Sequence, residues 1–559
     1  MGKDLTPEAI ELLQYLMKNK DTSDFAEYFS ASTICHRRGR LKVREVEPLL
    51  EELSKVRAIL PSKEVFRAPR YLLNEDKAQK ILDEYEEENT IYTQEYRDAL
   101  EEEVKNYKKF VITTAVMGKE VNKPFADALR NYARRNNALL LVLPCEDVVS
   151  RGKKATKTLE ISPELADFKV VFKDTYINDN LCLCAIKVSA KQINPLTGLD
   201  RLAVQRQASI IVASPKTFLR YIPNMHYDIP PALMTTGAVT VNNYDTDKYM
   251  SKRTSTLAEN DHAYGAIIVE VEDERIFHFR QVQASPYNSI TDMGIDYFPN
   301  GAIQSMDETV MIMGDSHTGY HDRDLHEATM EAALKTGVGT VFLHDVFNGT
   351  SVSHHDAGKG ITRAIKAQEN RLGLEEECIA VKNYISNIEQ HDMEVCIVNS
   401  NHDNHLLRYL EEGRYVNEPV NYAFSLKLAL AAVNGENPLQ YAIEEEIGYK
   451  NSRVYWMPED QSFRIYGVEV SMHGDRGANG SRGSLPIFEK GLGNCVVAHT
   501  HSAAILRNAF CVGTVGVMDQ GYNKGLSSWT RTCCLIYKNG TKQLINFIPD
   551  EYGKYKYTL

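Results

Sequence analysis

The chain is 559 residues long, with 43% hydrophobic and 25% charged residues, which is typical of a soluble globular protein. This length exceeds one typical hydrophobic core, so we expect several domains. The 64 Lys and Arg residues are outnumbered by 76 Asp and Glu residues, and the net charge is −12 with histidine neutral. Bulk positive charge therefore does not hold this chain to nucleic acid as in a histone, although the net value does not exclude local basic patches.

The apolar segments are short, and none approaches the roughly 20 residues of a membrane-spanning helix. The N-terminal sequence has no signal-peptide core. The ten cysteines fit neither a zinc ribbon nor a disulfide framework. We therefore expect a cytoplasmic protein with reduced thiols and no membrane partner. Gly358-Lys359-Gly360 lacks the leading Gly and the following Ser or Thr of a phosphate-binding P-loop, so we expect no ATPase within the chain.

Residues 1–74 read as a small helical module. The segments TPEAIELLQYLMKN, SDFAEYF and VREVEPLLEELSKV predict three helices, followed by a short β-like tail. This is the outline of a winged helix-turn-helix, in which Arg37, Arg38 and Arg40 form a basic corner that can dock on DNA. The alternative is a protein-contact module with a solvated basic loop, because the helices are otherwise acidic.

Two further segments precede the C-terminal half. Residues 75–109 are rich in acidic residues and predict a charged helical connector or oligomerisation arm. Residues 110–304 open with the strand-like FVITTAVMG, the helical FADALRNYARRNNA and the strand-like LLLVLP. This β-α-β order predicts an α/β domain, and we find no catalytic constellation in it.

Residues 305–559 contain five short apolar runs that each end in residues of metal-binding type. The runs are VMIMG, TVFL, EVCIV, VEVSM and CVVA, which end respectively in Asp315-Ser316-His317, His344-Asp345, Asn401-His402-Asp403, His473 and His499-Thr500-His501. Short apolar runs are typical of buried strands. Ligands gather beyond the carboxyl ends of strands in open α/β sheets, so we expect the five strand ends to meet at one rim.

The side chains at this rim offer nitrogen and oxygen donors and no sulfur. In Asp-x-His and His-x-His pairs, residues i and i+2 share a face of an extended chain, so each pair presents two donors together. Such donors suit Mn²⁺, Fe²⁺ or Zn²⁺. One such cluster alone is commonly a capped strand end or a packed histidine, but five in succession favour a metal site.

The order GDSH, HD, SNHD, HGD, AHTH resembles the ligand pattern of the calcineurin-like metallophosphoesterase superfamily. The resemblance covers residues 305–559 and implies a four-layer α/β/β/α sandwich there, which carries a largely helical insertion over 404–450. His344, Ser400 and Ala498 stand where the pattern has glycine, which affects turn geometry and not coordination.

The resemblance implies two divalent metal ions, with Mn²⁺ favoured and Mg²⁺, Fe²⁺ or Zn²⁺ as alternatives. The first ion would be held by Asp315, His317 and His501, the second by Asn401, His473 and His499, and Asp345 would bridge them. Two such ions can share a hydroxide and stabilise an in-line phosphoryl displacement. His402 would protonate the leaving oxygen or stabilise transition-state charge, and Asp403 would hold its tautomer. The alternative for Asp403 is a helix N-cap.

Two segments bear on the phosphoester that is cleaved. HDVFNGTS is similar to a segment of the SbcCD-type double-strand-break-repair nucleases, but Asn348 stands where that group has a histidine that places the DNA phosphate. Asn348 is therefore our candidate for this phosphate contact. The mode of cleavage, exo or endo, therefore stays open. HGDRGANGSRGS places Arg476 and Arg482 in a glycine-rich loop, which predicts a phosphate clamp. The alternative is a flexible lid with solvated arginines.

The whole arrangement resembles phage proteins of the T5 type that degrade host DNA. That resemblance implies a Mn²⁺-dependent deoxyribonuclease that acts on double-stranded DNA in the bacterial cytoplasm, as a homo-oligomer of at least two chains. One alternative is a small-substrate phosphatase or phosphodiesterase, which the negative net charge favours. Another is a regulator that binds DNA through residues 1–74 and keeps a phosphoesterase fold without turnover.

Overall fold

The computed structural model describes residues 5–22, 25, 28–38, 42–62, 68–89, 94–147, 161–225, 229–244, 252–301, 303–305, 308–521 and 523–559. Arg40 of the predicted basic corner lies outside these residues. The chain divides into two compact units, which are residues 1–100 with 150–160 and residues 101–149 with 161–559.

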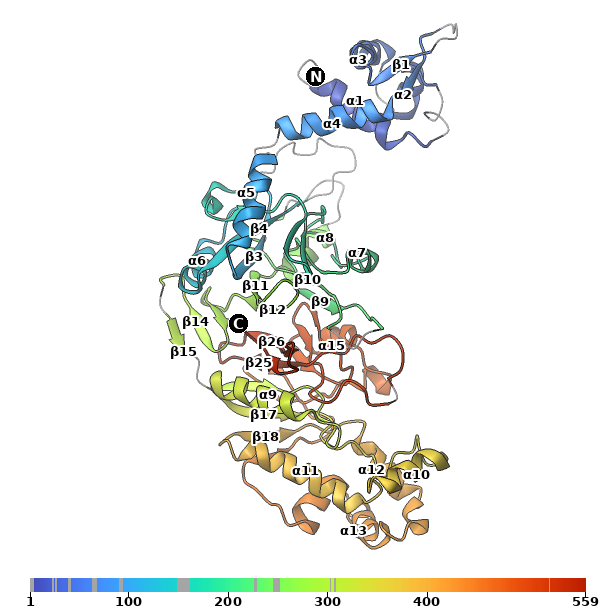
Figure 1. The fold of residues 1–559 in the computed structure, drawn as a ribbon, viewed down its shortest axis with the longest axis vertical. Helices are drawn as coiled ribbons and strands as arrows, with labels where there is room; N and C mark the ends of the chain where they lie inside the picture. Colours follow the sequence, from blue (N-terminus) through green and yellow to red (C-terminus); the bar gives the residue numbers. More distant parts are fainter. Residues whose placement is uncertain are drawn as a thin grey trace. The chain divides into compact units, whose positions relative to one another are not determined.

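The first unit is built from short helices around one apolar core (Figure 1). Its elements are α1 (Pro7–Lys18), α2 (Ala31–Arg38), α3 (Val43–Lys55), β1 (Ile59–Pro61), β2 (Tyr71–Leu73) and α4 (Glu75–Asn89), with β1 and β2 antiparallel. The first and third predicted helices and the β-tail are present as α1, α3 and the β1–β2 pair. The second helix differs from the prediction: α2 begins at Ala31, after the segment SDFAEYF. That segment lies partly outside the described residues, and its Phe29 pairs with Tyr71 in an isolated antiparallel bridge. Ala78, Ile81 and Leu82 of α4 are buried in the same core, because their i, i+3, i+4 spacing puts them on one face. The predicted boundary at residue 74 therefore lies inside this core, and α4 is not a solvated connector.

The second unit begins with α5 (Gln94–Lys105), in which the division between the units falls, and continues into a five-stranded sheet. The sheet order is β12 (Phe277–Gln283), β11 (Gly265–Val271), β3 (Lys109–Val116), β4 (Ala138–Cys145) and β5 (Lys169–Val170). Strands β3 and β4 are parallel and are connected by α6 (Lys123–Asn136), as the β-α-β pattern predicts.

A ten-stranded sheet combines segments from both sides of residue 304. Its order is β20 (Arg464–Ile465), β21 (Val468–Glu469), β22 (Cys495–Val497), β24 (Ala509–Cys511), β23 (Ala504–Leu506), β9 (Phe218–Tyr221), β10 (Ala232–Thr235), β8 (Ser209–Val212), β7 (Leu181–Cys184) and β6 (Thr175–Asn178). Strands β23 and β9 pair antiparallel and join the two halves. The division between residues 110–304 and 305–559 stays a prediction about domains, but one hydrogen-bonded sheet crosses it.

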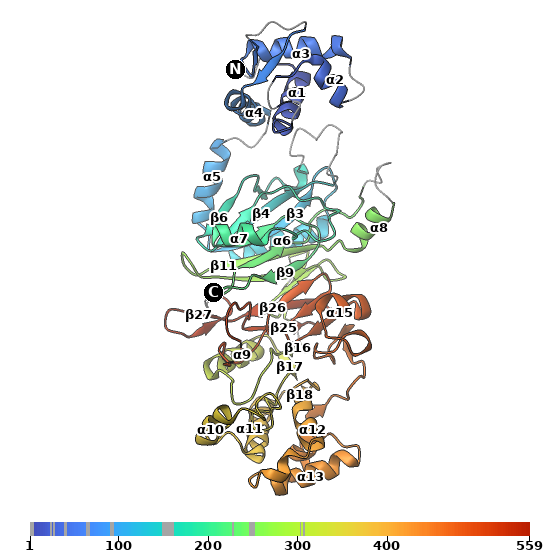
Figure 2. The ribbon, with the colours of Figure 1, turned by 90° about the vertical axis from the view of Figure 1, so that its right-hand side faces the viewer.

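A six-stranded sheet carries the first three candidate ligand segments. Its order is β19 (Val454–Trp456), β18 (Glu394–Ile397), β17 (Val338–Leu343), β16 (Thr309–Ile312), β25 (Thr532–Ile536) and β26 (Lys542–Asn546), with β16 to β19 parallel. In both views helices α10 to α13 gather beyond β18, away from β25 and β26 (Figures 1 and 2). These and the neighbouring helices are α9 (Arg323–Lys335), α10 (Gly360–Gln368), α11 (Leu374–Glu389), α12 (Asp403–Glu411), α13 (Tyr422–Val433) and α14 (Pro438–Tyr441), the last continued by a π-helical turn (Ala442–Glu446). The segment 404–450 is thus helical, as expected.

The remaining elements are small. They are α7 (Asp200–Arg206), α8 (Lys252–Asn260), α15 (Leu485–Leu492), a three-stranded sheet of β13 (Ile290–Asp292), β14 (Ile295–Tyr297) and β15 (Ile303–Ser305), and the pair β27 (Ile548–Pro549) and β28 (Tyr555–Lys556). The chain is of mixed α/β class, as predicted, while the four-layer sandwich stays a prediction. Among the described residues, no helix combines the length and apolarity needed to cross a membrane.

Candidate metal centre

The five predicted ligand strands are present, but they belong to two sheets. Strands β16, β17 and β18 are parallel neighbours in the six-stranded sheet, and β21 and β22 are parallel neighbours in the ten-stranded sheet. The expected single rim is therefore a meeting of two sets of carboxyl ends. A metal site can form in this way, because it requires only that the ligand-bearing loops meet at one point. The loops can follow strands of different sheets.

The first set of ligand atoms belongs to Asp315, His317, Asp345 and His501, and these atoms lie within 4.8 Å of one another. The Nε2 atom of His501 is 2.9 Å from His317 Nε2 and 3.0 Å from Asp315 Oδ2. The Nε2 atom of His317 is 3.7 Å from Asp345 Oδ2. All four side chains are buried, so this set can hold a divalent ion away from bulk water.

The second set shares Asp345 and adds His473 and His499, again within 4.8 Å. The Nε2 atom of His473 is 3.3 Å from Asp345 Oδ2 and 3.0 Å from Asn401 Oδ1. The same Asn401 oxygen is 3.0 Å from His499 Nδ1. Asn401 and His499 are partly exposed, so the centre opens to solvent on this side.

Four of the candidate ligands have backbones in the left-handed region, which L-residues rarely adopt. The φ angles are +45° at His317, +45° at Asp345, +74° at His499 and +56° at His501. Such conformations cost roughly 1–3 kcal/mol each and persist where the surrounding structure imposes them. Each turns the chain sharply just after a strand, which aims the side chain back toward the centre.

Glycine is required immediately before the first ligand. A Cβ atom added to Gly314 would lie 2.8 Å from Gly513 O and from Thr514 Cα. This close approach allows Asp315 to bridge to Thr514 along the backbone, and the Thr514 hydroxyl donates to Asp315 O at 2.8 Å. The chain after β16 is therefore held against the segment before β25.

The unpaired polar atoms at the centre fit a bound cation. Both carboxylate oxygens of Asp315 and Oδ1 of Asp345 are buried with no hydrogen-bond partner among the described residues. A buried carboxylate in this condition is unfavourable unless a positive charge compensates it. The donor set of carboxylate, amide oxygen and imidazole is one that Mn²⁺, Fe²⁺ and Zn²⁺ accept.

The pKa values also indicate a strongly negative environment. Burial opposes charge on His473, but the carboxylates of Asp345 and Asp315 outweigh it and raise the pKa of His473 to about 9. Burial likewise opposes ionisation of Asp345, yet the imidazoles of His473 and His402 hold its pKa well below the ordinary value. By contrast, desolvation lowers the pKa of His317 to about 3, so its imidazole is neutral. The two carboxylates thus favour a protonated His473 at the position where a second metal ion would bind.

Loading this centre with Mn²⁺ near pH 7.5 should release about one proton per chain, because the ion must displace the proton of His473. Binding should weaken as pH falls, since protons compete for a group whose pKa is about 9. Titration calorimetry in two buffers of different ionisation enthalpy measures the proton count. His473→Asn should abolish the release, while the exposed His391→Asn should leave it unchanged. An undiminished release in His473→Asn would contradict this account of the centre.

Asn348 holds two histidines in place. Its Oδ1 lies 3.0 Å from His317 Nδ1 and accepts that N–H, while its amide donates to Thr350 Oγ1 at 2.6 Å. Its backbone carbonyl accepts from His402 Nδ1 at 2.7 Å. When Nδ1 of an imidazole carries the hydrogen of such a bond, Nε2 is the nitrogen left to bind a metal ion or a proton. This applies to His317 and to His402. The structure thus shows Asn348 positioning two histidines, while its contact with a phosphate stays a prediction.

The expected hydrogen bond from Asp403 to His402 is absent. Asp403 Oδ2 instead accepts from Ser400 N at 2.9 Å, which closes the turn that enters α12. Asp403 is not the N-cap of the alternative either, because it is the first residue of α12 and His402 occupies the N-cap position without a side-chain capping bond. Desolvation raises the pKa of Asp403 to about 7. The tautomer of His402 is held by the Asn348 carbonyl, which sequence reasoning did not find because the partner is a backbone atom.

Asn348→Ala should weaken Mn²⁺ binding by roughly 10–100-fold, because an outer partner of a ligating histidine typically has that effect. Asn348→Asp should restore most of the affinity, since a carboxylate also accepts from His317 Nδ1. Calorimetry of Mn²⁺ binding measures both variants. Equal loss in the two variants would indicate a packing defect and not the loss of an acceptor.

The two predicted phosphate-binding arginines lie on an exposed hairpin-like loop. Arg476 pairs with Glu459 and lies 3.6 Å from Asp475, so its charge is partly neutralised. Arg482 is exposed and bridges to Arg476 through the backbone. The glycines of this loop serve backbone packing: a Cβ atom on Gly483 would lie 1.9 Å from Gly474 O. A phosphate clamp here stays a prediction that requires Arg476 to exchange its partner.

The arginines of the N-terminal module belong to the other unit. Arg37 is exposed at the end of α2, and Arg38 ends that helix. Their proposed contact with DNA stays a prediction.

Two aromatic residues pack beside the ligands, and the sequence predicted a role for neither of them. His344 is fully buried, and its ring stacks on His473 at a centroid distance of 5.6 Å. Trp529 packs against His501 at 4.2 Å. Adjacency to Asp345 could have signalled His344, but Trp529 has no sequence signal because its segment carries no ligand.

Comparison with known proteins gives one relevant similarity. "Protein A1" of Escherichia phage T5 is 28% identical over 469 residues, which cover 80% of this chain and 83% of that protein. No family model matches the chain. No solved structure matches it. The chain is therefore similar over most of its length to a phage protein.

Proposed function

We propose that this chain is a two-metal-dependent phosphodiesterase that cleaves DNA, encoded by a phage of the T5 type and acting on host DNA in the bacterial cytoplasm. The observation that carries the proposal is the single buried carboxylate, Asp345, that belongs to both sets of candidate ligands. A carboxylate shared in this way is the arrangement expected for two ions close enough to act on one phosphate.

When bound, the two ions supply Lewis-acid stabilisation of the phosphate and an activated water nucleophile. Asp315, His317 and His501 would hold one ion, and Asn401, His473 and His499 the other. The partly exposed Asn401, His402 and His499 mark the side from which a phosphodiester can approach. The backbone strain and the buried environment keep these side chains in place before substrate arrives, which is the basis of electrostatic preorganisation.

His402 is the candidate for proton transfer. Its Nδ1–H donates to Asn348 O at 2.7 Å, so Nε2 is the atom that can hold a transferable proton. The ring lies 4.7 Å from that of His317, which places it beside the centre without making it a member of either ligand set. From there it can protonate the leaving oxygen of the ester.

A polymeric substrate and a phage origin have separate support. The similarity to a T5 protein over most of the chain favours the phage origin. Asn401 and His499 are partly exposed, so a diester of a long polymer can reach them, and Arg37 and Arg38 of the N-terminal unit are the proposed second contact with DNA. Mn²⁺ is the favoured ion because the donors mix carboxylate, amide and imidazole.

Asp345→Asn should abolish Mn²⁺-dependent degradation of plasmid DNA, with a loss of at least about 10³-fold. Lewis-acid stabilisation contributes several kcal/mol, and each 1.36 kcal/mol is tenfold in rate. Supercoiled and linear plasmid incubated with Mn²⁺, Mg²⁺ or EDTA provide the measurement. Asp392→Asn, at an exposed position, is the matched control and should cleave normally.

A small diester such as bis(p-nitrophenyl) phosphate distinguishes the alternatives. Metal-dependent hydrolysis of the small diester with intact plasmid would replace the nuclease by a small-substrate phosphodiesterase. DNA binding without turnover in any divalent metal would favour the regulator.

His402→Ala should lower the cleavage rate by about 10²–10⁴-fold while Mn²⁺ binding is retained, because general acid catalysis has that magnitude. Single-turnover cleavage and calorimetry measure the two quantities on the same preparation. Normal cleavage by His402→Ala would show that the leaving oxygen takes its proton from another source.

A further inference from the structure

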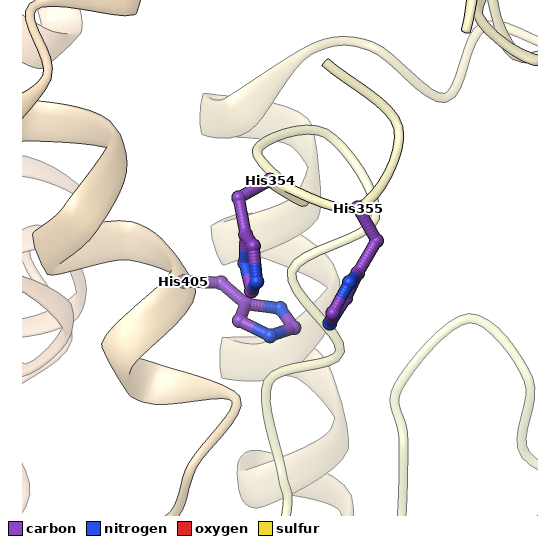
Figure 3. A group of neighbouring side chains, drawn as sticks. All are labelled: His354, His355 and His405. Carbon is purple, nitrogen blue, oxygen red and sulfur yellow. The ribbon is translucent and has the colours of Figure 1, made fainter. Parts of the chain in front are cut away.

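A third group of imidazoles lies outside the two ligand sets. One nitrogen from each of His354, His355 and His405 lies within 4.8 Å of the others. Figure 3 shows the three rings converging, with His354 and His355 on one loop and His405 on a helix. The loop follows β17 and the helix is α12, so two segments far apart in sequence form the group. The ring centroids are 3.8 Å apart for His354 and His355, and 5.0 Å for His354 and His405.

Two nitrogen atoms in this group have no hydrogen-bond partner in the described part of the chain. Nδ1 of His354 and Nδ1 of His405 are buried and have no hydrogen-bond partner among the described residues. His405 is about 9% exposed, whereas His355 is exposed to solvent. Unsatisfied nitrogens in a polar cluster are unfavourable unless a ligand uses them. The group thus combines three neighbouring imidazoles with solvent access on the side of His355.

The loop that carries His354 and His355 is firmly anchored. Both oxygens of Glu377 accept backbone N–H groups, from Thr350 at 2.7 Å and from Ser351 at 2.9 Å. Arg414 donates to Val352 O at 2.8 Å, and Lys366 donates to Asp356 at 2.7 Å. These bonds flank the two histidines on either side. The donors are therefore preorganised, which limits the entropy that a ligand must offset on binding.

The space for His405 depends on a glycine. Gly349 has φ +69°, and a Cβ atom there would lie 3.1 Å from Nδ1 and 3.2 Å from Cβ of His405. Burial, together with the neighbouring imidazoles of His402 and His354, lowers the pKa of His405 to about 3. The ring is therefore neutral, which is the form that ligates a metal.

We propose that His354, His355 and His405 form a separate binding site for a single imidazole-preferring transition-metal ion of the Zn²⁺ class. Three nitrogen ligands with the fourth position open to solvent match the coordination that zinc adopts in sites with a free position. The set contains no carboxylate, so it disfavours Mg²⁺ and Mn²⁺ and favours Zn²⁺, Ni²⁺ or Cu²⁺. It thus differs in chemistry from the carboxylate-containing centre at Asp345.

The site lies next to the candidate centre but does not share a ligand with it. His402 stands between them, with its ring 4.7 Å from His317 and 4.8 Å from His405. The proposal concerns metal binding alone and does not depend on the proposed nuclease activity.

Equilibrium dialysis of the full chain against Zn²⁺, followed by elemental analysis, tests the proposal. At a Zn²⁺ concentration that saturates the wild-type chain, His354→Ala and His355→Ala should each bind one ion fewer. The affinity loss for that ion should exceed the roughly 10–100-fold that removal of an outer partner causes. His391→Ala, which removes an exposed imidazole elsewhere, should keep the full stoichiometry. His355 is exposed, so its variant is expected to fold normally.

The same comparison in an Asp345→Asn background separates this site from the candidate centre. The one-ion difference should persist there, and Co²⁺ added in place of Zn²⁺ should give a four-coordinate visible absorption that His355→Ala removes. Unchanged Zn²⁺ binding in both histidine variants would overturn the proposal and leave the cluster as packed side chains. Loss of the one-ion difference in the Asp345→Asn background would also overturn it, because the bound ion would then belong to the main centre.

Discussion

The arrangement of the second unit depends on the burial of two carboxylates, Asp315 and Asp345, among histidines. A carboxylate taken out of water without compensation is unfavourable by several kcal/mol. Here three of the four oxygens have no hydrogen-bond partner among the described residues, and the nearest groups are imidazole nitrogens. The interior of the protein is therefore strongly negative at these two carboxylates, and a bound cation would compensate this charge. The positive φ angles of the neighbouring ligands show the backbone adapting to this requirement.

Two sheets contribute to that point, and neither would build it alone. Strands β16, β17 and β18 bring Asp315, Asp345 and Asn401, while β21 and β22 bring His473 and the two histidines that follow Ala498. The ten-stranded sheet also includes β9 and β10, so residues before 304 support the position of the later ligands. This gives the middle segment a structural connection to the centre, although its described residues contribute no candidate ligand.

The loop after β17 contributes residues to several parts of the candidate site. Its first residues, His344 and Asp345, belong to the centre and its immediate packing. Asn348 then orients His317 and His402 through two hydrogen bonds, and its amide donates a third to Thr350. A few residues later, His354 and His355 meet His405, on the far side of His402. One anchored loop thus links the carboxylate centre, the candidate proton donor and the accessory imidazoles.

The sequence by itself indicated the five donor clusters, the apolar strand that precedes each of them and the mixed α/β class, and the family resemblance named seven residues of these clusters as candidate ligands. These are local properties: apolar runs form buried strands, and donor residues follow them directly. It also indicated the helices of 404–450 and the β-α-β unit after residue 109.

Only the tertiary structure decided which atoms meet. It distributed the ligand strands over two sheets, placed α4 in the core of the first unit and occupied Asn348 with histidines. It also paired Asp403 with Ser400 and Arg476 with Glu459, and assembled His354, His355 and His405 from distant segments. The physical reason is that hydrogen bonds and close packing depend on distances between residues that are remote in sequence, and many of these bonds involve backbone atoms. Residue type and spacing along the chain do not specify such distances.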